Sequence, residues 1–168
     1  MGTYSGHAMT TLAIDAATTT GIAMVDGAEL LHASVVMTRS NTLQRLSLLQ
    51  MLPTPDRVAI ERPQLRTVND DKASQGKAQG TLAVSRHVGM WQALCELAYP
   101  GVTVVHVYPA TWRSALRFPS GDRKHLKALS LAAARARWPH VEWKTDDQSD
   151  AALMALAVEN TPALWTPR

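Results

Sequence analysis

Carboxylate residues end two of the apolar runs that are typical of buried strands. Asp15 closes the run LAID, and Glu61 closes the run VAIE. A buried carboxylate costs free energy unless it is hydrogen-bonded, paired with a cation or bound to a metal ion. Taken singly, Asp15 could be a turn residue and Glu61 a solvated strand end. Their chemistry therefore depends on whether the fold brings the two side chains together.

A third group of acids lies near the C-terminal end, in the stretch KTDDQSDAALMALA. Asp147 and Asp150 are spaced i, i+3, which puts both on one face of the helix that they begin. Asp146 and Asp147 could also be favourable charges at a helix N-terminus, with Thr145 and Gln148 as a capping box. Asp150 fits that explanation less well, because it lies about one turn inside the helix, beside an apolar run. Asp146 is the alternative to Asp147 as the first member of the pair.

The elements expected around these acids form an α/β domain with a mixed five-stranded sheet flanked by helices. The Asp26-Gly27 pair favours a hairpin, so the first three strands should be antiparallel. A helix between the third and fourth strands implies a crossover, and the fourth strand should therefore run parallel to the first. We expect strands at 11–14, 22–25, 29–37, 57–60 and 102–107, and helices at 41–52, about 72–97, 122–138 and about 147–159.

This arrangement predicts a shared acidic site. Neighbouring parallel strands end at the same edge of a sheet, so Asp15 and Glu61 should converge there. Carboxylates about 4 Å apart repel one another by several kcal/mol, and proteins keep such clusters when cations neutralise them. Oxygen ligands without histidine or cysteine favour Mg²⁺ or Mn²⁺. Two such ions, about 4 Å apart, can activate a water and stabilise the leaving oxygen in phosphodiester hydrolysis.

Composition narrows the class of protein and of partner. The chain has 168 residues and a formal net charge of +3, a basic balance that suits a polyanionic partner. A single cysteine excludes an internal disulfide framework. No apolar run approaches the roughly 20 residues that span a bilayer, so we expect a cytoplasmic protein with no membrane partner. Residues 1–8 have the composition of a leader or disordered tail, and residues 9–168 should form a single domain.

These features, taken in order, resemble the RuvC-type Holliday junction resolvases, which have the ribonuclease H-like fold. The resemblance runs from about Met9 to Val158. It is carried by the strand that ends in Asp, the hairpin, the AIERP strand, the long helix with a G-x-A-x-G pattern at 76–80, and the D-x-x-D-A start of the last helix. It implies an endonuclease with two Mg²⁺ ions per active site, Mn²⁺ being the alternative. Its metal-binding and catalytic residues would be Asp15, Glu61, Asp147 and Asp150.

The resemblance also implies the partners. The substrate would be branched DNA, a four-way junction, in recombination and repair within a bacterial or phage-infected cell. A homodimer is expected, because paired cuts across a two-fold junction call for two equivalent sites. The residues themselves identify no branch-migration partner. One departure concerns the segment RPQLR, where Gln64 or Leu65 stands in place of the aromatic residue that many relatives carry after the fourth-strand Glu.

Basic residues flank the acidic edge and are the expected DNA contacts. They follow the fourth strand, lie on the long helix and open the helix at 122–138: Arg62, Arg66, Lys72, Lys77, Arg123, Lys124 and Lys127. The helix at 122–138 should have a buried stripe made of Leu126, Leu129, Ala133 and Ala136. The charged residues of its first turn should then face outward, where they could contact phosphate. Each cation alone could equally be a solvated surface residue. Trp112 could stack on a base, or cover an edge of the core.

Three other functions stay open on the residues alone. The first is another metal-dependent, structure-selective or single-strand nuclease. The second is a non-catalytic ribonuclease H-like protein that binds nucleic acid. The third follows from DAATTTG, which also resembles the phosphate loop of actin-like sugar kinases and ATPases. Those proteins enclose a nucleotide between two such domains, and 168 residues supply one.

Overall fold

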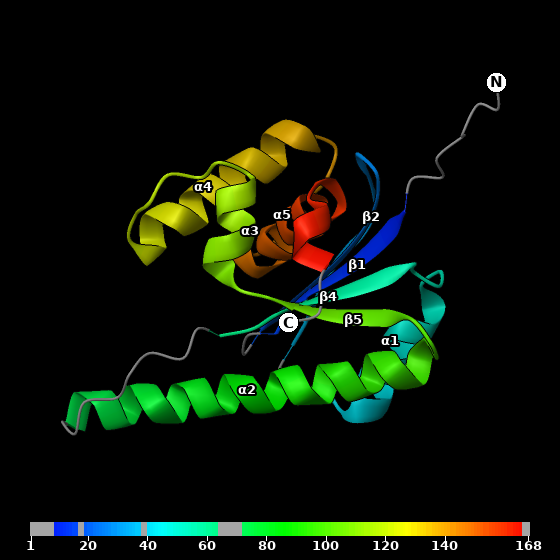
Figure 1. Ribbon diagram of the computed structural model, residues 1–168, viewed down its shortest axis with the longest axis horizontal. Helices are drawn as coiled ribbons and strands as arrows, with labels where there is room; N and C mark the ends of the chain where they lie inside the picture. Colours follow the sequence, from blue (N-terminus) through cyan, green and yellow to red (C-terminus); the bar gives the residue numbers. More distant parts are fainter. Residues whose placement is uncertain (1–8, 17–18, 38–39, 64–71, 166–168) are drawn as a thin grey trace.

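The computed structural model describes residues 9–16, 19–37, 40–63 and 72–165 (Figure 1). The expected leader at 1–8 and the predicted contact Arg66 lie outside these residues. The strands are β1 (Thr10–Asp15), β2 (Thr20–Asp26), β3 (Glu29–Val36), β4 (Arg57–Glu61) and β5 (Thr103–Val107). The helices are α1 (Thr42–Met51), α2 (Lys72–Ala98), α3 (Pro109–Ala115), α4 (Arg123–Arg137), α5 (Asp146–Asn160) and the 3-10 helix η1 (Pro162–Trp165).

The five strands form one mixed sheet in the order β3-β2-β1-β4-β5. β1 and β2 are antiparallel, as are β2 and β3, whereas β4 runs parallel to both β1 and β5. The mixed five-stranded sheet predicted from the crossover argument is therefore confirmed. Ile14 of β1 pairs with Ile60 of β4, so the acids that follow these residues leave the sheet at the same edge.

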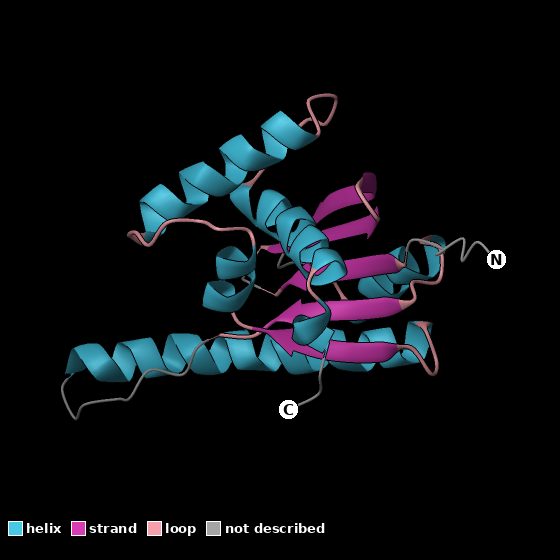
Figure 2. Ribbon diagram, turned by 45° about the horizontal axis from the view of Figure 1, so that its top comes forward, coloured by secondary structure: helices cyan, strands magenta, loops and turns pink. Residues whose placement is uncertain are grey.

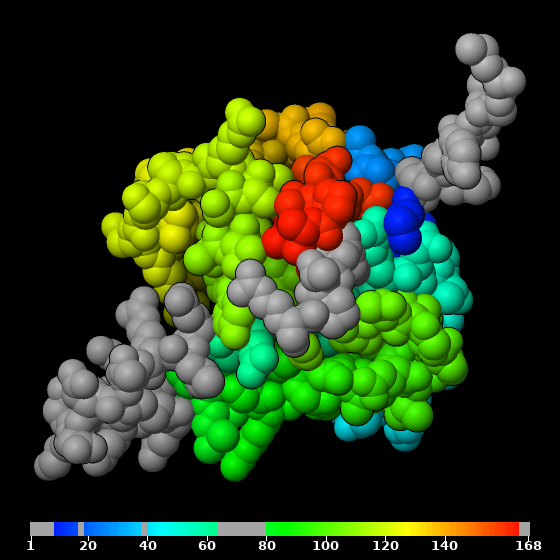
Figure 3. Space-filling model, in the orientation of Figure 1, coloured from blue at the N-terminus to red at the C-terminus, as the bar shows by residue number. Residues whose placement is uncertain are grey.

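Helices cover both faces of the sheet (Figure 2). α1 and α2 lie on one face, while α3, α4 and α5 lie on the other. From outside, α2 forms the lower margin of the molecule, and α3 with α4 forms its upper left part (Figure 3). Among the described residues, no helix combines the length and apolarity needed to cross a bilayer.

The two faces of the sheet carry side chains of different size. Toward α1 and α2, the central strands present large residues such as Leu12 and Ile14, which pack with Leu49, Trp91 and Tyr99. Toward α5 they present alanines that are aligned across three strands, and all of these are fully buried: Ala13, Ala23 and Ala59. Because successive side chains of a strand point to opposite faces of the sheet, the pairing of the strands determines which residues lie on each face. The small face lets a helix lie close to the sheet.

α5 is the helix that lies on this small face. Every residue from Gln148 to Val158 is buried, since the sheet covers one side of the helix and α3 and α4 cover the other. Alanines on the helix, Ala151 and Ala155 among them, meet those on the sheet. A helix covered all round needs no polar face, and this explains the apolar run AALMALA.

Two details differ from the expectations. α3 was not predicted, because Pro109–Ala115 is too short for a clear periodic pattern. The predicted buried stripe of α4 is correct only in part: Ala133 packs against the core and its two leucines are half-buried, but Ala136 is exposed. The fully buried residues of the helix are Ser130 and Ala134. α4 packs on α5 through these small residues. The helix is therefore rotated from the orientation that its leucines suggest.

Candidate active site

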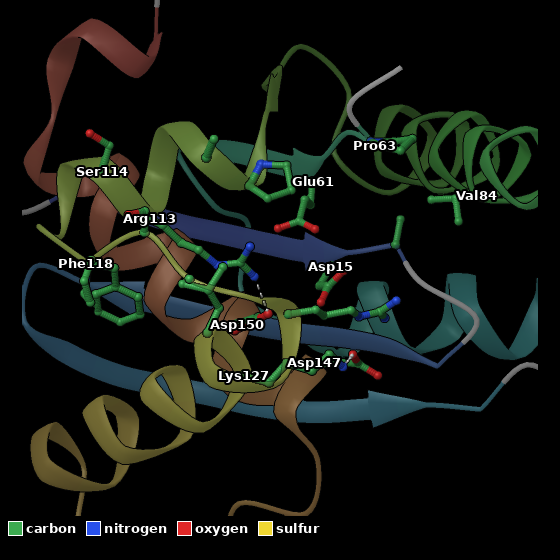
Figure 4. Close-up of a pocket in the computed structure, with 18 residues that line it drawn as sticks. Asp15, Glu61, Pro63, Val84, Arg113, Ser114, Phe118, Lys127, Asp147 and Asp150 are labelled. Carbon is green, nitrogen blue, oxygen red and sulfur yellow. Dashed lines mark hydrogen bonds and ion pairs between the residues drawn. The ribbon is translucent and has the colours of Figure 1, made fainter. Parts of the chain in front are cut away.

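The acids at the ends of β1 and β4 meet at one edge of the sheet, as predicted. Asp15 and Glu61 are the last residues of their strands, and each comes one step beyond the Ile14–Ile60 pair. Both line a cavity of about 720 Å³, together with Asp147 and Asp150 of α5. Figure 4 shows the carboxylates of Asp15, Glu61 and Asp150 turned toward a common space, with Asp147 at its margin. Asp146 is not among the residues that line this cavity.

The start of α5 is fixed by hydrogen bonds at its first turn. The Thr145 hydroxyl caps the helix by accepting the Gln148 N–H at 3.2 Å. The Gln148 side chain does not complete a capping box. Its oxygen accepts the Lys144 N–H at 3.0 Å, and its amide donates to the Ala33 carbonyl of β3 at 3.0 Å. Gln148 thus ties the acidic turn to the sheet.

A glycine sets the distance between this turn and the sheet. Gly21 of β2 pairs with Asp15 in the antiparallel ladder. A Cβ atom added to Gly21 would lie 1.9 Å from the Asp147 carbonyl oxygen and 2.9 Å from the Gln148 nitrogen. Only a residue without a side chain permits such an approach. The glycine that follows the threonines after Asp15 therefore places Asp147 beside Asp15.

α3 contributes two residues that were not assigned to the site from the sequence. For Trp112, full burial supports the core-covering alternative and contradicts stacking on a base. Trp112 is fully buried, and its indole N–H donates to Oε2 of Glu61 at 2.8 Å. Arg113 donates from Nη2 to Oδ2 of Asp150 at 2.9 Å, and its guanidinium lies 4.6 Å from the centre of the Trp112 ring. The sequence feature that could have placed Trp112 and Arg113 at the site is their position just after β5, because β5 ends at the same edge of the sheet as β4.

α4 delivers a further cation to the acids. The Lys127 ammonium pairs with Asp146 and lies 3.6 Å from Oδ1 of Asp147. Lys127 was expected to face outward toward phosphate, but it reaches back over the start of α5 and lines the cavity. The rotation of α4 that buries Ser130 accounts for this direction.

Burial makes the acidic cluster resist full ionisation. Burial raises the pKa of Asp15 well above its ordinary value, and the charges of Glu61, Asp150 and Asp147 raise it further. Burial likewise raises the pKa of Glu61 to about 7, against the hydrogen bond from Trp112, which lowers it. Burial also raises the pKa of Asp150, and the Ser130 hydroxyl and the charge of Arg113 partly oppose that shift. An added cation would therefore stabilise the ionised form of each of these carboxylates.

The chemistry of the donor set fits a hard divalent ion. The four acids that line the cavity offer oxygen ligands, which Mg²⁺ and Mn²⁺ prefer. Oδ1 of Asp150 is buried, and the nearby Ser130 hydroxyl forms no hydrogen bond of ordinary geometry with it. Among the described residues, however, no group of three or more His, Cys, Asp or Glu side chains has the geometry to hold a metal ion. Arg113 and Lys127 pair with the acids instead, so an ion would replace side-chain cations.

The other predicted DNA contacts lie at varied distances from the acids. Arg123 lines the main cavity, and Lys124 is exposed on the first turn of α4. Arg62 is exposed after β4 and lines a second cavity of about 260 Å³. The side chains of Lys72 and Lys77 lie outside the described residues. No observation tests these residues as DNA contacts, and they stay predictions.

Comparison with known proteins identifies the fold. No protein-family model matches the chain, and no curated protein matches its sequence. A solved structure of Thermus thermophilus RuvC in complex with a Holliday junction substrate is similar, with 22% sequence identity and a TM-score of 0.58. A second Thermus thermophilus RuvC structure gives 21% identity and a TM-score of 0.51. Each comparison covers 89% of this chain and 92% of the other. The chain therefore has a RuvC-like, ribonuclease H-like fold.

Proposed function

We propose that the protein is a Mg²⁺-dependent endonuclease that cuts four-way DNA junctions, with Mn²⁺ as an alternative metal. The observation that carries this proposal is the convergence of Asp15, Glu61 and Asp150, from three separate elements, on one cavity. Among the described residues, neither Asp15 nor Glu61 forms an ion pair with lysine or arginine. Buried acids without such partners are the expected ligands of a metal ion.

The residues of the cavity have separate tasks in this reaction. Asp15, Glu61 and Asp150 hold the metal, and Asp147 is the fourth ligand or orients the attacking water. When bound, two divalent ions supply an activated water and neutralise the charge that develops on the leaving oxygen. Arg113, Arg123 and Lys127 line the same cavity and are placed to bind the phosphates on either side of the cut.

The junction substrate and the homodimer rest on separate arguments. The structural match includes RuvC in complex with a Holliday junction, and this supports branched DNA as the substrate. For the dimer, α2 offers an uncovered surface, where Leu82 and Ala83 are exposed and a Cβ at Gly80 would meet nothing within 4 Å. Two equivalent sites would match the two-fold symmetry of a four-way junction.

The experiment compares Asp15→Asn and Asp150→Asn with the wild-type protein on an end-labelled four-way junction, a linear duplex and a single strand. With Mg²⁺ the wild-type protein should cut the junction selectively, and both variants should lose cutting while they still bind the junction. Asp56→Asn is a matched control, because Asp56 is exposed and accepts the Thr10 N–H at the opposite end of β1.

Each result of this experiment has a clear meaning. Cutting that survives in either site variant would refute the assignment of the acids. Equal cutting of all three substrates would replace the junction with a broader nuclease activity. Junction binding without any cutting by the wild-type protein would favour a non-catalytic binding protein. Binding should also weaken steeply as salt rises, because phosphate contacts release counterions.

A further inference from the structure

Trp112 differs in its hydrogen bonding from the other buried tryptophans that the structure describes. Its indole N–H donates to the carboxylate of Glu61 at 2.8 Å. Trp138 donates to the backbone carbonyl of Ala28 at 3.2 Å, and Trp91 donates to the Thr20 hydroxyl at 3.2 Å. A hydrogen bond to an ionised acceptor is shorter and stronger than one between neutral groups. Trp112 thus makes a contact that core filling does not require.

The indole of Trp112 is held in place independently of Glu61. The side chain is fully buried, and its ring meets Phe118 edge-on, with 6.2 Å between the ring centres. The Arg113 guanidinium lies over the ring, and Arg113 is itself anchored to Asp150. A fully buried ring packed against Phe118 does not follow a moving carboxylate, even when an ion displaces Arg113 from Asp150. Glu61 therefore has to orient to the indole.

The bond engages one oxygen of Glu61, and among the described residues no hydrogen bond reaches the other. An indole has a single N–H and accepts no hydrogen bond through it, so it occupies Oε2 alone. We infer that Trp112 is a positioning residue, which fixes the Glu61 carboxylate so that Oε1 binds a divalent ion as a single ligand atom. This inference rests on the proposed metal-dependent function of the site. Partners that orient a ligand in this way typically change metal affinity by about 10-fold or more.

The test uses the indole N–H resonances of the ¹⁵N-labelled full chain, which contains five tryptophans. Trp112→Phe and Trp138→Phe assign two of these resonances. Replacing the charged acceptor in Glu61→Gln should shift the Trp112 resonance upfield and leave that of Trp138 in place. Adding Mg²⁺ to the wild-type protein should move the Trp112 resonance as the ion binds.

The affinity for Mg²⁺ is then followed at the backbone amide of Gly21, the partner of Asp15 in the sheet. Trp112→Phe removes the donor but keeps an aromatic ring, and it should raise the Mg²⁺ midpoint about 10-fold. Trp138→Phe makes the same chemical change beside the β2–β3 turn, where the indole donates to Ala28, and its midpoint should equal that of the wild type.

The outcomes separate this inference from the proposed function. If the wild-type protein binds Mg²⁺ and Trp112→Phe binds it with the same midpoint, the inference is wrong and the proposed function stands. If the wild-type protein shows no response to Mg²⁺, both are wrong. Should Trp112→Phe fail to fold, the Trp112 resonance is assigned instead through its ring contact with Phe118, and the Glu61→Gln spectrum decides, since an unchanged Trp112 resonance overturns the inference.

Discussion

Replacing Gly21 by alanine tests how the acidic turn of α5 is placed against the sheet. The added Cβ would lie 1.9 Å from the Asp147 carbonyl oxygen and 2.4 Å from its carbon. Both atoms belong to the backbone of the first turn, which is held by the bonds of Gln148 to Lys144 and to Ala33. The clash therefore cannot be relieved by turning a side chain.

The expected loss of stability follows from the distance by which the Asp147 carbonyl must move away from the new Cβ. Real Cβ atoms essentially never come within 3.0 Å of another atom, so the carbonyl must retreat from 1.9 Å to at least that distance, by about 1.1 Å. Overpacking of this kind costs about 1–3 kcal/mol of stability. We expect the upper end, about 3 kcal/mol, because backbone has to move. A displacement of about 1 Å in a catalytic group typically lowers the rate about 100-fold.

Urea unfolding and junction cleavage measure the two effects separately. Gly89→Ala is the control, because it is the same chemical change on α2, where the added Cβ meets nothing within 4 Å. It leaves the acidic turn of α5 untouched, and it should raise stability by about 0.5–1 kcal/mol through helix propensity. A Gly21→Ala protein with wild-type stability and wild-type cleavage would refute the account of how α5 is placed.

Three further predictions concern charge and backbone strain. In the folded protein the pKa of Glu61 is about 7, against an ordinary value of 4.5, so the folded state holds a proton that the unfolded chain releases in that window. The contribution of Glu61 to the stability of the metal-free protein should then be full below pH 4.5 and fall by about 3 kcal/mol as the pH rises to 7. Urea unfolding of Glu61→Gln should show a fall that is smaller by this amount, with the loss due to Asp15 and Asp150 remaining, and Mg²⁺ should restore stability of the wild-type protein at the higher pH. Lys127→Ala removes a cation 3.6 Å from Asp147 and should tighten Mg²⁺ binding about 2- to 5-fold, as read by calorimetry. The exposed Lys124 serves as its control, and an equal gain in Lys124→Ala would show a general charge effect instead. Arg117 follows α3 with a positive φ of 59°, so Arg117→Gly should stabilise the protein by roughly 1 kcal/mol in urea, whereas Arg117→Ala, which keeps a Cβ, should not.

The sheet and the convergence of its acids could be predicted because they depend on general rules. A helix between two strands implies parallel strands, and parallel neighbours end at one edge. The structure confirms this with β4 beside β1. The positions of Asp15 and Glu61 then follow from their place at the ends of apolar runs, with no knowledge of side-chain packing.

The cations of the site could not be predicted in the same way. Arg113 reaches Asp150 from α3, a helix of seven residues whose direction depends on the turn after β5. Lys127 points inward because α4 packs through Ser130 and Ala134, whereas leucines were expected to mark the buried side. Small and polar residues at a close helix contact give no hydrophobic signal. The orientation of α4 therefore becomes visible only once α5 is in place.

The geometry of the acidic site depends on residues that carry no chemistry. Asp150 lies about one turn inside α5, and it reaches the level of Asp15 only if that helix lies close to the sheet. The closeness comes from alanines on both sides, with Ala13 and Ala59 on the strands and Ala151 on the helix, all fully buried. A larger side chain on that face would lift α5 and separate its acids from those of β1 and β4, because packed interiors do not absorb extra volume. The four acids can therefore form the proposed metal site only together with the small residues beneath them.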